Sequence, residues 1–153
     1  MDATTTIKIS AASLPQKFVD LQHMREGHAH EKRDCSVVAY SIVAEMPYTE
    51  AHKTLQQLGR KARCGCYFSQ LANRLNLYQR ADLACKQIST ALRDMQQGRF
   101  VVRVSGHVMA VVDGCVIDAY TTKPTRITRM VYQYSTNGAL DARGNRLQLQ
   151  SGD

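Results

Sequence analysis

The sequence predicts an α+β fold, with its helices in the first part of the chain and most of its strands after them. Apolar residues in the first half recur at the spacing of a helix face, whereas the second half contains short β-branched runs bounded by turn residues. With 153 residues, of which 44% are hydrophobic, the chain suits one domain with a packed core. We expect this domain to span residues 1–136 and the polar residues 137–153 to form a mobile tail.

Capping residues, prolines and glycines divide the first two thirds of the chain into predicted helices. Ser13 and Gln16 resemble a capping box for the first helix. The second helix begins at Cys35, has the most regular apolar stripe, and is expected to end at Pro47. The predicted helices span residues 14–24, 35–46, 49–58, 66–75 and 89–97.

The strands are predicted over residues 100–104, 107–112, 115–120 and 129–134. Asp113-Gly114 stands between the second and third runs and predicts a two-residue hairpin turn, because both turn positions favour positive φ. Such a turn pairs Val112 with Cys115 and fixes the register of every other pair. By this count His107 and Asp118 lie on the same face of the sheet as diagonal neighbours.

Charge and cysteine content narrow the classes of protein. The chain carries a formal net charge of +7, but its basic residues are scattered, with a modest cluster only at Arg60, Lys61 and Arg63. This pattern favours a solvated surface over a dedicated nucleic-acid face. Five irregularly spaced cysteines in a chain of this length predict free thiols rather than a disulfide scaffold. The polar N-terminus and the absence of a long apolar run predict a cytoplasmic protein that does not enter a membrane.

Cys35 is a candidate nucleophile because it opens the most regular of the predicted helices. The free N–H groups and the dipole at a helix N-terminus stabilise a thiolate, which is the reactive form of cysteine. Asp34, directly before it, stands where a residue could cap the helix. A second interpretation stays open, in which Cys35 is a small apolar residue buried at a helix start.

His107 and Asp118 are candidates for the groups that would activate this thiol. An aspartate beside a histidine holds the imidazole in one tautomer and stabilises its charged form. A half-buried carboxylate needs a partner, and His107 is the nearest candidate for Asp118. Taken alone, a histidine in an apolar strand such as His107 is more often a hydrogen-bonded residue of the core. Gly106 before it indicates a bend or bulge where the strand begins.

Two segments of the chain, taken together, have the order of a known family. Residues 33–39 (RDCSVVA) open an apolar helix with a cysteine, and residues 98–107 (GRFVVRVSGH) lead through Asp113-Gly114 to Asp118. This order resembles the papain-like cysteine peptidase superfamily. Within it, the chain is similar to short phage and bacterial proteins that resemble bacteriocin-leader-processing peptidases. The resemblance covers about residues 30–120.

The resemblance implies a papain-like fold, in which a nucleophile helix starting at Cys35 and the other N-terminal helices pack on a C-terminal antiparallel sheet. It implies Cys35 as the nucleophile, His107 as the general base and Asp118 as the orienting acid. The implied reaction cleaves an amide, peptide or isopeptide bond of a protein or peptide substrate, with no metal and no cofactor. A phage-encoded relative would work in the cytoplasm of a bacterial host.

The chain departs from the pattern of this family at two places beside the cysteine. Papain-like enzymes usually hold the oxyanion with a side-chain donor, commonly glutamine, shortly before the nucleophile. Here Ala29 occupies that place, and the neighbouring His30 is the candidate donor. Ser36 stands where related peptidases often have glycine, which implies narrower access to the thiol.

Other functions stay open on the sequence. A papain-like domain without catalysis, such as a phage-type protein that binds a host protein, suits the size, the charge and the missing glutamine. The basic balance permits nucleic-acid binding, although the aromatic residues do not interleave with Lys or Arg. Cys64 and Cys66 could ligate a soft metal with Cys85 or His52, but a Cys-x-Cys departs from the usual zinc spacing and has no matching second pair.

Overall fold

The computed structural model describes residues 14–28, 31–61, 65 and 68–135. The expected tail over residues 137–153, Ser13 of the expected capping box, and Ala29 and His30 lie outside these residues. The strands are β1 (Gln16–Phe18), β2 (Leu77–Gln79), β3 (Arg99–Val104), β4 (His107–Val112), β5 (Cys115–Asp118) and β6 (Met130–Tyr134). The helices are α1 (Leu21–Met24), α2 (Cys35–Val43), α3 (Tyr48–Gln57), α4 (Phe68–Leu71) and α5 (Ile88–Ala91), with 3₁₀ turns over Ala72–Leu75, Ala81–Leu83 and Leu92–Asp94.

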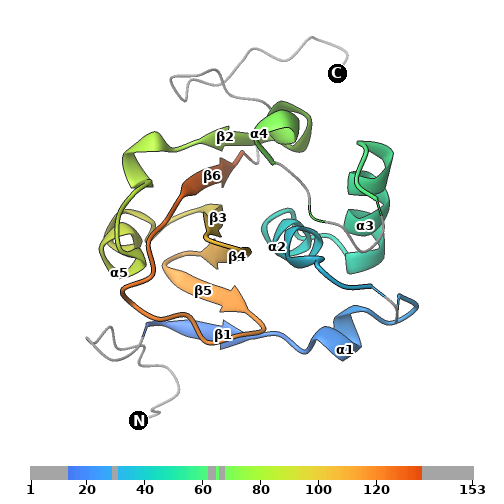
Figure 1. Cartoon of the computed structure of the whole chain (residues 1–153), viewed down its shortest axis with the longest axis horizontal. Helices are drawn as coiled ribbons and strands as arrows, with labels where there is room; N and C mark the ends of the chain where they lie inside the picture. Colours follow the sequence, from blue (N-terminus) through green and yellow to red (C-terminus); the bar gives the residue numbers. More distant parts are fainter. Residues whose placement is uncertain (1–13, 29–30, 62–64, 66–67, 136–153) are drawn as a thin grey trace.

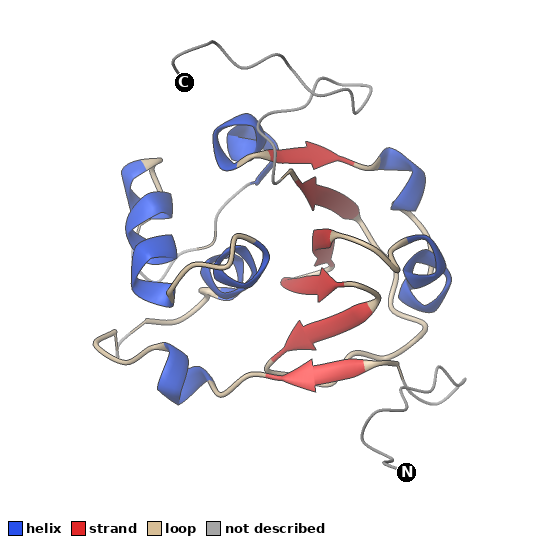
Figure 2. Cartoon of the chain, turned by 180° about the vertical axis from the view of Figure 1, so that it is seen from behind, coloured by secondary structure: helices blue, strands red, loops and turns tan. Residues whose placement is uncertain are grey.

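A six-stranded sheet in the order β1-β5-β4-β3-β6-β2 forms the middle layer of the molecule. Figures 1 and 2 show α2 and α3 on one side of this sheet and α5 on the other. The predicted α+β class is therefore confirmed. No helix in the described part of the chain is long and apolar enough to cross a membrane.

The core has two parts, one on each face of the sheet. On the face covered by α2 and α3, Val101 and Ala110 pack with the buried side of α2. On the opposite face, Phe100 and Val102 pack with Ile88 of α5. Because successive residues of a strand point to opposite faces, the apolar run of β3 supplies both parts of the core. Burial on both faces explains why this run is nearly continuous rather than alternating.

The start of the chain differs from the prediction. The expected helix over residues 14–24 is wrong for most of its length, since Gln16–Phe18 form β1 and only Leu21–Met24 are helical. β1 lies parallel to β5, with Gln16 opposite Val116. The sheet is therefore mixed, and the expectation of a purely antiparallel sheet is wrong. Main-chain hydrogen bonds to the edge of β5 outweigh the weak helical pattern here, and the Asp20 side chain caps α1 by accepting from the N–H of His23.

Several other elements are shorter than expected. α2 ends at Val43 rather than at Pro47, because Glu45 adopts a left-handed conformation with φ 54°. The segments expected to be helical at residues 66–75 and 89–97 contain short α-helices continued by 3₁₀ turns, and residues 66–67 lie outside the described part. β5 ends at Asp118, two residues early, where the Asp118 carboxylate accepts a hydrogen bond from the N–H of Ala119. Three residues, Leu77–Gln79, form the unpredicted strand β2.

The hairpin that joins β4 to β5 has the predicted turn and register. Asp113 and Gly114 both have positive φ, at 48° and 80°. Val112 pairs with Cys115, and the pairing continues in step along the two strands. The register thus brings the start of β4 beside the end of β5, which is where His107 and Asp118 lie.

Candidate active site

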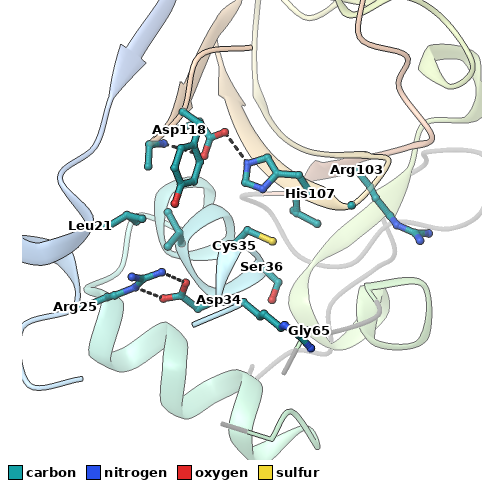
Figure 3. A pocket seen from close by; sticks show the side chains of 15 residues that line it. Leu21, Arg25, Asp34, Cys35, Ser36, Gly65, Arg103, His107 and Asp118 are labelled. Carbon is teal, nitrogen blue, oxygen red and sulfur yellow. Dashed lines mark hydrogen bonds and ion pairs between the residues drawn. The ribbon is translucent and has the colours of Figure 1, made fainter. Parts of the chain in front are cut away.

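A cleft opens where the N-terminus of α2 meets the start of β4 and the end of β5 (Figure 3). Its volume is about 470 Å³. Cys35, His107 and Asp118 all line it, together with charged, small and aromatic side chains from the segments around them. The structure therefore brings together the three residues that the sequence singled out.

Cys35 is the first residue of α2, and its thiol is free and half-buried. The first N–H groups of a helix have no acceptor within the helix, so they point toward a group placed at this end. Behind Cys35, Val37, Ala39 and Val43 are buried in the core and hold the helix in place. The position therefore combines a favourable electrostatic environment with a rigid support and an open cleft.

His107 is held by Asp118 from the neighbouring strand. Its Nε2 atom lies 2.6 Å from Oδ2 of Asp118, whose side chain is only 6% exposed. Because Nε2 is occupied, Nδ1 is the ring nitrogen left for another partner, and Figure 3 shows the imidazole between Asp118 and the sulfur of Cys35. The ring of Tyr120 contacts the imidazole edge to face, with the ring centres 6.0 Å apart.

The surroundings of His107 favour its protonated form. Hydrogen bonding to Asp118, and next the interaction with Cys35, raise the pKa of His107 to about 9, although burial opposes the shift. At neutral pH the imidazole is therefore a cation, with a carboxylate on one side and the thiol on the other. A cation in this place stabilises negative charge on Cys35.

Asp34 has a different role from the expected helix cap. It occupies the N-cap position, but its side chain makes no capping hydrogen bond. Instead the carboxylate pairs with the guanidinium of Arg25 and accepts a 2.7 Å hydrogen bond from the hydroxyl of Tyr48. Burial raises the pKa of Asp34, but Arg25 and Tyr48 outweigh it and hold the pKa below its usual value. This pairing ties α1 and α3 to the residue before the nucleophile.

We expect Asp34→Asn to lower the free energy of unfolding by about 2–3 kcal/mol, because it leaves Arg25 without its buried carboxylate partner. Urea unfolding at pH 7 would measure this loss. Asp82→Asn is a matched control, since Asp82 pairs with Arg80 but is 60% exposed. The control is expected to change stability by less than about 0.5 kcal/mol. Equal losses in the two variants would contradict the structural role assigned to Asp34.

A second buried charge cluster lies behind the cleft. Glu31 accepts hydrogen bonds from both terminal guanidinium nitrogens of Arg60, at 3.1 and 3.2 Å, and its Oε2 atom lies 2.6 Å from Nε2 of His52. His52, weighed above as a metal ligand, thus bonds a carboxylate and anchors the loop before Cys35 to α3. No group of three or more His, Cys, Asp or Glu side chains placed to hold a metal occurs within the described ranges, and Cys64 and Cys66 fall outside them.

Neither expectation at the two positions where the chain departs from the papain-like pattern is tested by the described residues. Ala29 and His30 lie outside the described residues, so the expected oxyanion donor His30 stays a prediction. Ser36 is 1% exposed, and its hydroxyl points away from the sulfur of Cys35 (Figure 3). Ser36 lines the cleft beside Cys35, so the expectation that it narrows access to the thiol stays a prediction.

Several residues that complete the cleft carry no signal in the sequence that would predict them. Arg25, Arg33 and Arg103 line it: Arg25 caps the end of α1, Arg33 lies in the loop before α2, and Arg103 lies near the end of β3. Tyr48 does not line the cleft itself but donates a hydrogen bond to Asp34, which does. These residues are brought together by the packing of distant segments, and none forms a local motif.

Comparison of the chain with protein-family models, with curated proteins and with solved structures finds no match.

Proposed function

We propose that this protein is a papain-like cysteine hydrolase that cleaves an amide, peptide or isopeptide bond. The observation that carries the proposal is His107, hydrogen-bonded to Asp118 at 2.6 Å and facing a half-buried cysteine at a helix N-terminus. A strand-borne histidine with an aspartate behind it and a helix-borne cysteine before it is the arrangement that nucleophilic catalysis by a thiol requires. The open cleft gives a substrate carbonyl access to the sulfur.

The proposed reaction begins with attack of the Cys35 sulfur on the carbonyl carbon. The carbonyl π electrons move to oxygen, and the main-chain N–H of Cys35 donates to this oxyanion. As the oxyanion collapses, the C–N bond breaks and His107 gives its Nδ1 proton to the leaving amine. Water then attacks the acyl-thioester carbonyl while His107 takes up a proton from the water. As this second oxyanion collapses, the C–S bond breaks, which releases the acid and restores the Cys35 thiolate beside the protonated imidazole. Asp118 accepts the Nε2 hydrogen bond throughout and does not change its protonation.

The architecture supports the papain-like assignment. A helix that opens with the nucleophile packs against antiparallel strands, and the first of these strands after a tight turn carries the base. The parallel strand β1 is an addition at the edge of the sheet next to β5. It pairs with β5 and not with β4, the strand that carries His107.

A binding module that retains this fold without catalysis is the second candidate function. The observation that favours it is Ala29, which stands where papain-like enzymes place the glutamine donor of the oxyanion hole. Such a module would be a phage-type protein that binds a protein of the bacterial host, and this binding would survive loss of the thiol. Removal of the thiol therefore distinguishes the two candidates.

The test is hydrolysis of a peptide mixture that represents every pair of neighbouring residues, read by mass spectrometry. We expect the wild type to cleave a subset of these peptides, and Cys35→Ala and His107→Ala to cleave none. Circular dichroism and urea unfolding would establish that both variants fold. Cleavage by folded Cys35→Ala at the wild-type rate would contradict the proposal, and failure of all three proteins to cleave would favour the binding module.

A further inference from the structure

The charges around the cleft do not cancel. The charged side chains that line it are Arg25, Arg33, Asp34, Arg103, His107 and Asp118. Both carboxylates already have a cationic partner, since Asp34 pairs with Arg25 and Asp118 pairs with His107. Two arginines, Arg33 and Arg103, therefore remain without an acidic partner in the described part of the chain.

Arg33 lies on the nucleophile side of the cleft. It comes two residues before Cys35, in the loop that leads into α2, and its side chain is exposed. Its backbone has φ 52°, which is uncommon for a residue other than glycine. The buried carboxylate of the next residue, Asp34, is bound by Arg25 and Tyr48 and is not available to Arg33.

Arg103 lies on the histidine side of the cleft. It is an exposed residue of β3, opposite Val108 of β4 and four residues before His107. Its guanidinium contacts the sulfur of Met130, a weak acceptor, at 3.8 Å. In Figure 3 Arg103 stands beside His107 with its guanidinium turned toward the rim of the cleft and away from Cys35.

Two guanidinium groups without an acidic partner make the cleft attractive to an anion, whereas the imidazolium of His107 is already paired with Asp118. Arginine presents a planar fork of donors that matches a carboxylate, so a bound carboxylate would make paired, charge-assisted hydrogen bonds. No unpaired acidic side chain among the described lining residues opposes such a ligand. The guanidinium of Arg103 is turned away from the sulfur of Cys35 in Figure 3, so it suits a side chain of a substrate and not the scissile carbonyl.

We propose that the cleft selects an acidic peptide, with Glu or Asp side chains next to the scissile bond held by Arg33 and Arg103. This inference rests on the proposed hydrolase and names its substrate class. It assigns the arginines to substrate binding and leaves the chemical step to Cys35 and His107. The excess of positive charge over the whole chain would add to the attraction of such a peptide.

The test uses two dipeptidyl chloromethyl ketones that differ only in a glutamate and its neutral isostere glutamine. The rate of labelling of Cys35 by each is read by peptide mass spectrometry. We expect the glutamate reagent to label wild-type Cys35 about tenfold faster, which corresponds to one well-placed ion pair. The preference should fall to about twofold or less in Arg33→Gln/Arg103→Gln and survive in Arg33→Lys/Arg103→Lys, which keeps the charge.

Arg93→Gln is the control for an arginine outside the cleft, because it removes one positive charge, where the Gln double variant removes two, from an exposed site beside α5 on the opposite face of the sheet. It should keep the full preference. Equal labelling of the wild type by the two ketones would overturn the inference, and so would an unchanged preference in the Gln double variant. Loss of the preference in Arg93→Gln would also overturn it, because a general effect of net charge would then explain the result.

A second measurement separates this inference from the proposed hydrolase. Iodoacetate and iodoacetamide alkylate any accessible thiol and differ in charge, so their rate ratio at Cys35 reports the cationic cleft without any peptidase activity. We expect the ratio of iodoacetate to iodoacetamide rates to fall at least threefold in the Gln double variant relative to the wild type. If the ketones do not label Cys35, the proposed hydrolase is contradicted, while this ratio still decides whether the arginines attract an anion. An unchanged ratio would overturn the inference.

Discussion

His107→Ala is expected to lower the rate constant for alkylation of Cys35 by iodoacetamide at pH 6 by at least tenfold. The thiolate is the form that reacts, and in the wild type the imidazolium of His107 faces the sulfur and stabilises negative charge on it. Alanine removes this cation and leaves only the N-terminus of α2. A tenfold change corresponds to about 1.4 kcal/mol, which is a small interaction energy for an ion pair that is partly shielded from solvent.

Peptide mass spectrometry measures this rate at each cysteine in the same sample. Cys85 is the internal control, because it is exposed and lies outside the cleft, and its rate should be the same in the two proteins. Tyr120→Ala is a second control for the loss of a ring beside the thiol without loss of charge. If Cys35 reacts at the same rate in wild type and His107→Ala, the imidazolium does not activate the thiol.

The second large effect is a loss of stability as the pH rises from about 6.5 to about 9. The pKa of His107 is raised to about 9 in the folded protein, whereas the pKa of a histidine in an unfolded chain is about 6.5. The folded state therefore holds its proton more tightly, so the stabilisation is complete below pH 6.5 and disappears as the pH passes 9. The shift corresponds to a loss of up to about 3 kcal/mol across this range.

Urea unfolding at half-unit steps of pH would measure this curve. Asp118→Asn removes the carboxylate that contributes most to the raised pKa, so its stability should vary much less between pH 6.5 and 9. The difference between wild type and variant isolates His107 from other groups that titrate in the same range. Parallel curves for the two proteins would contradict the assigned partnership of His107 and Asp118.

The hairpin and the nucleophile helix were predictable because their signals are local. Asp113 and Gly114 supply the two positive φ angles of a tight turn, and that turn alone fixes which residues of β4 and β5 are neighbours. The proximity of His107 and Asp118 follows from this register and is confirmed. The apolar stripe that begins at Cys35 likewise predicts α2 from its own residues.

What the sequence did not predict depends on contacts between distant segments. β1 is a three-residue strand that is stabilised by pairing with β5, about a hundred residues away along the chain. Its own short apolar pattern is equally compatible with a helix. Asp34 was expected to cap α2, but tertiary packing places Arg25 and Tyr48 against it and they bind the carboxylate instead. The meeting of Arg33 and Arg103 at one cleft is also a product of packing, since no local spacing connects a loop before α2 with β3.

The central claim is that at neutral pH His107 is an imidazolium held between Asp118 and the thiol of Cys35. Titration of His107 by NMR, with its ring signals assigned from the spectrum of His107→Gln, tests it most directly. The account predicts that His107 titrates near pH 9 in the wild type and at a clearly lower pH in Asp118→Asn. A wild-type His107 that titrates near pH 6.5, unchanged in Asp118→Asn, would contradict the account.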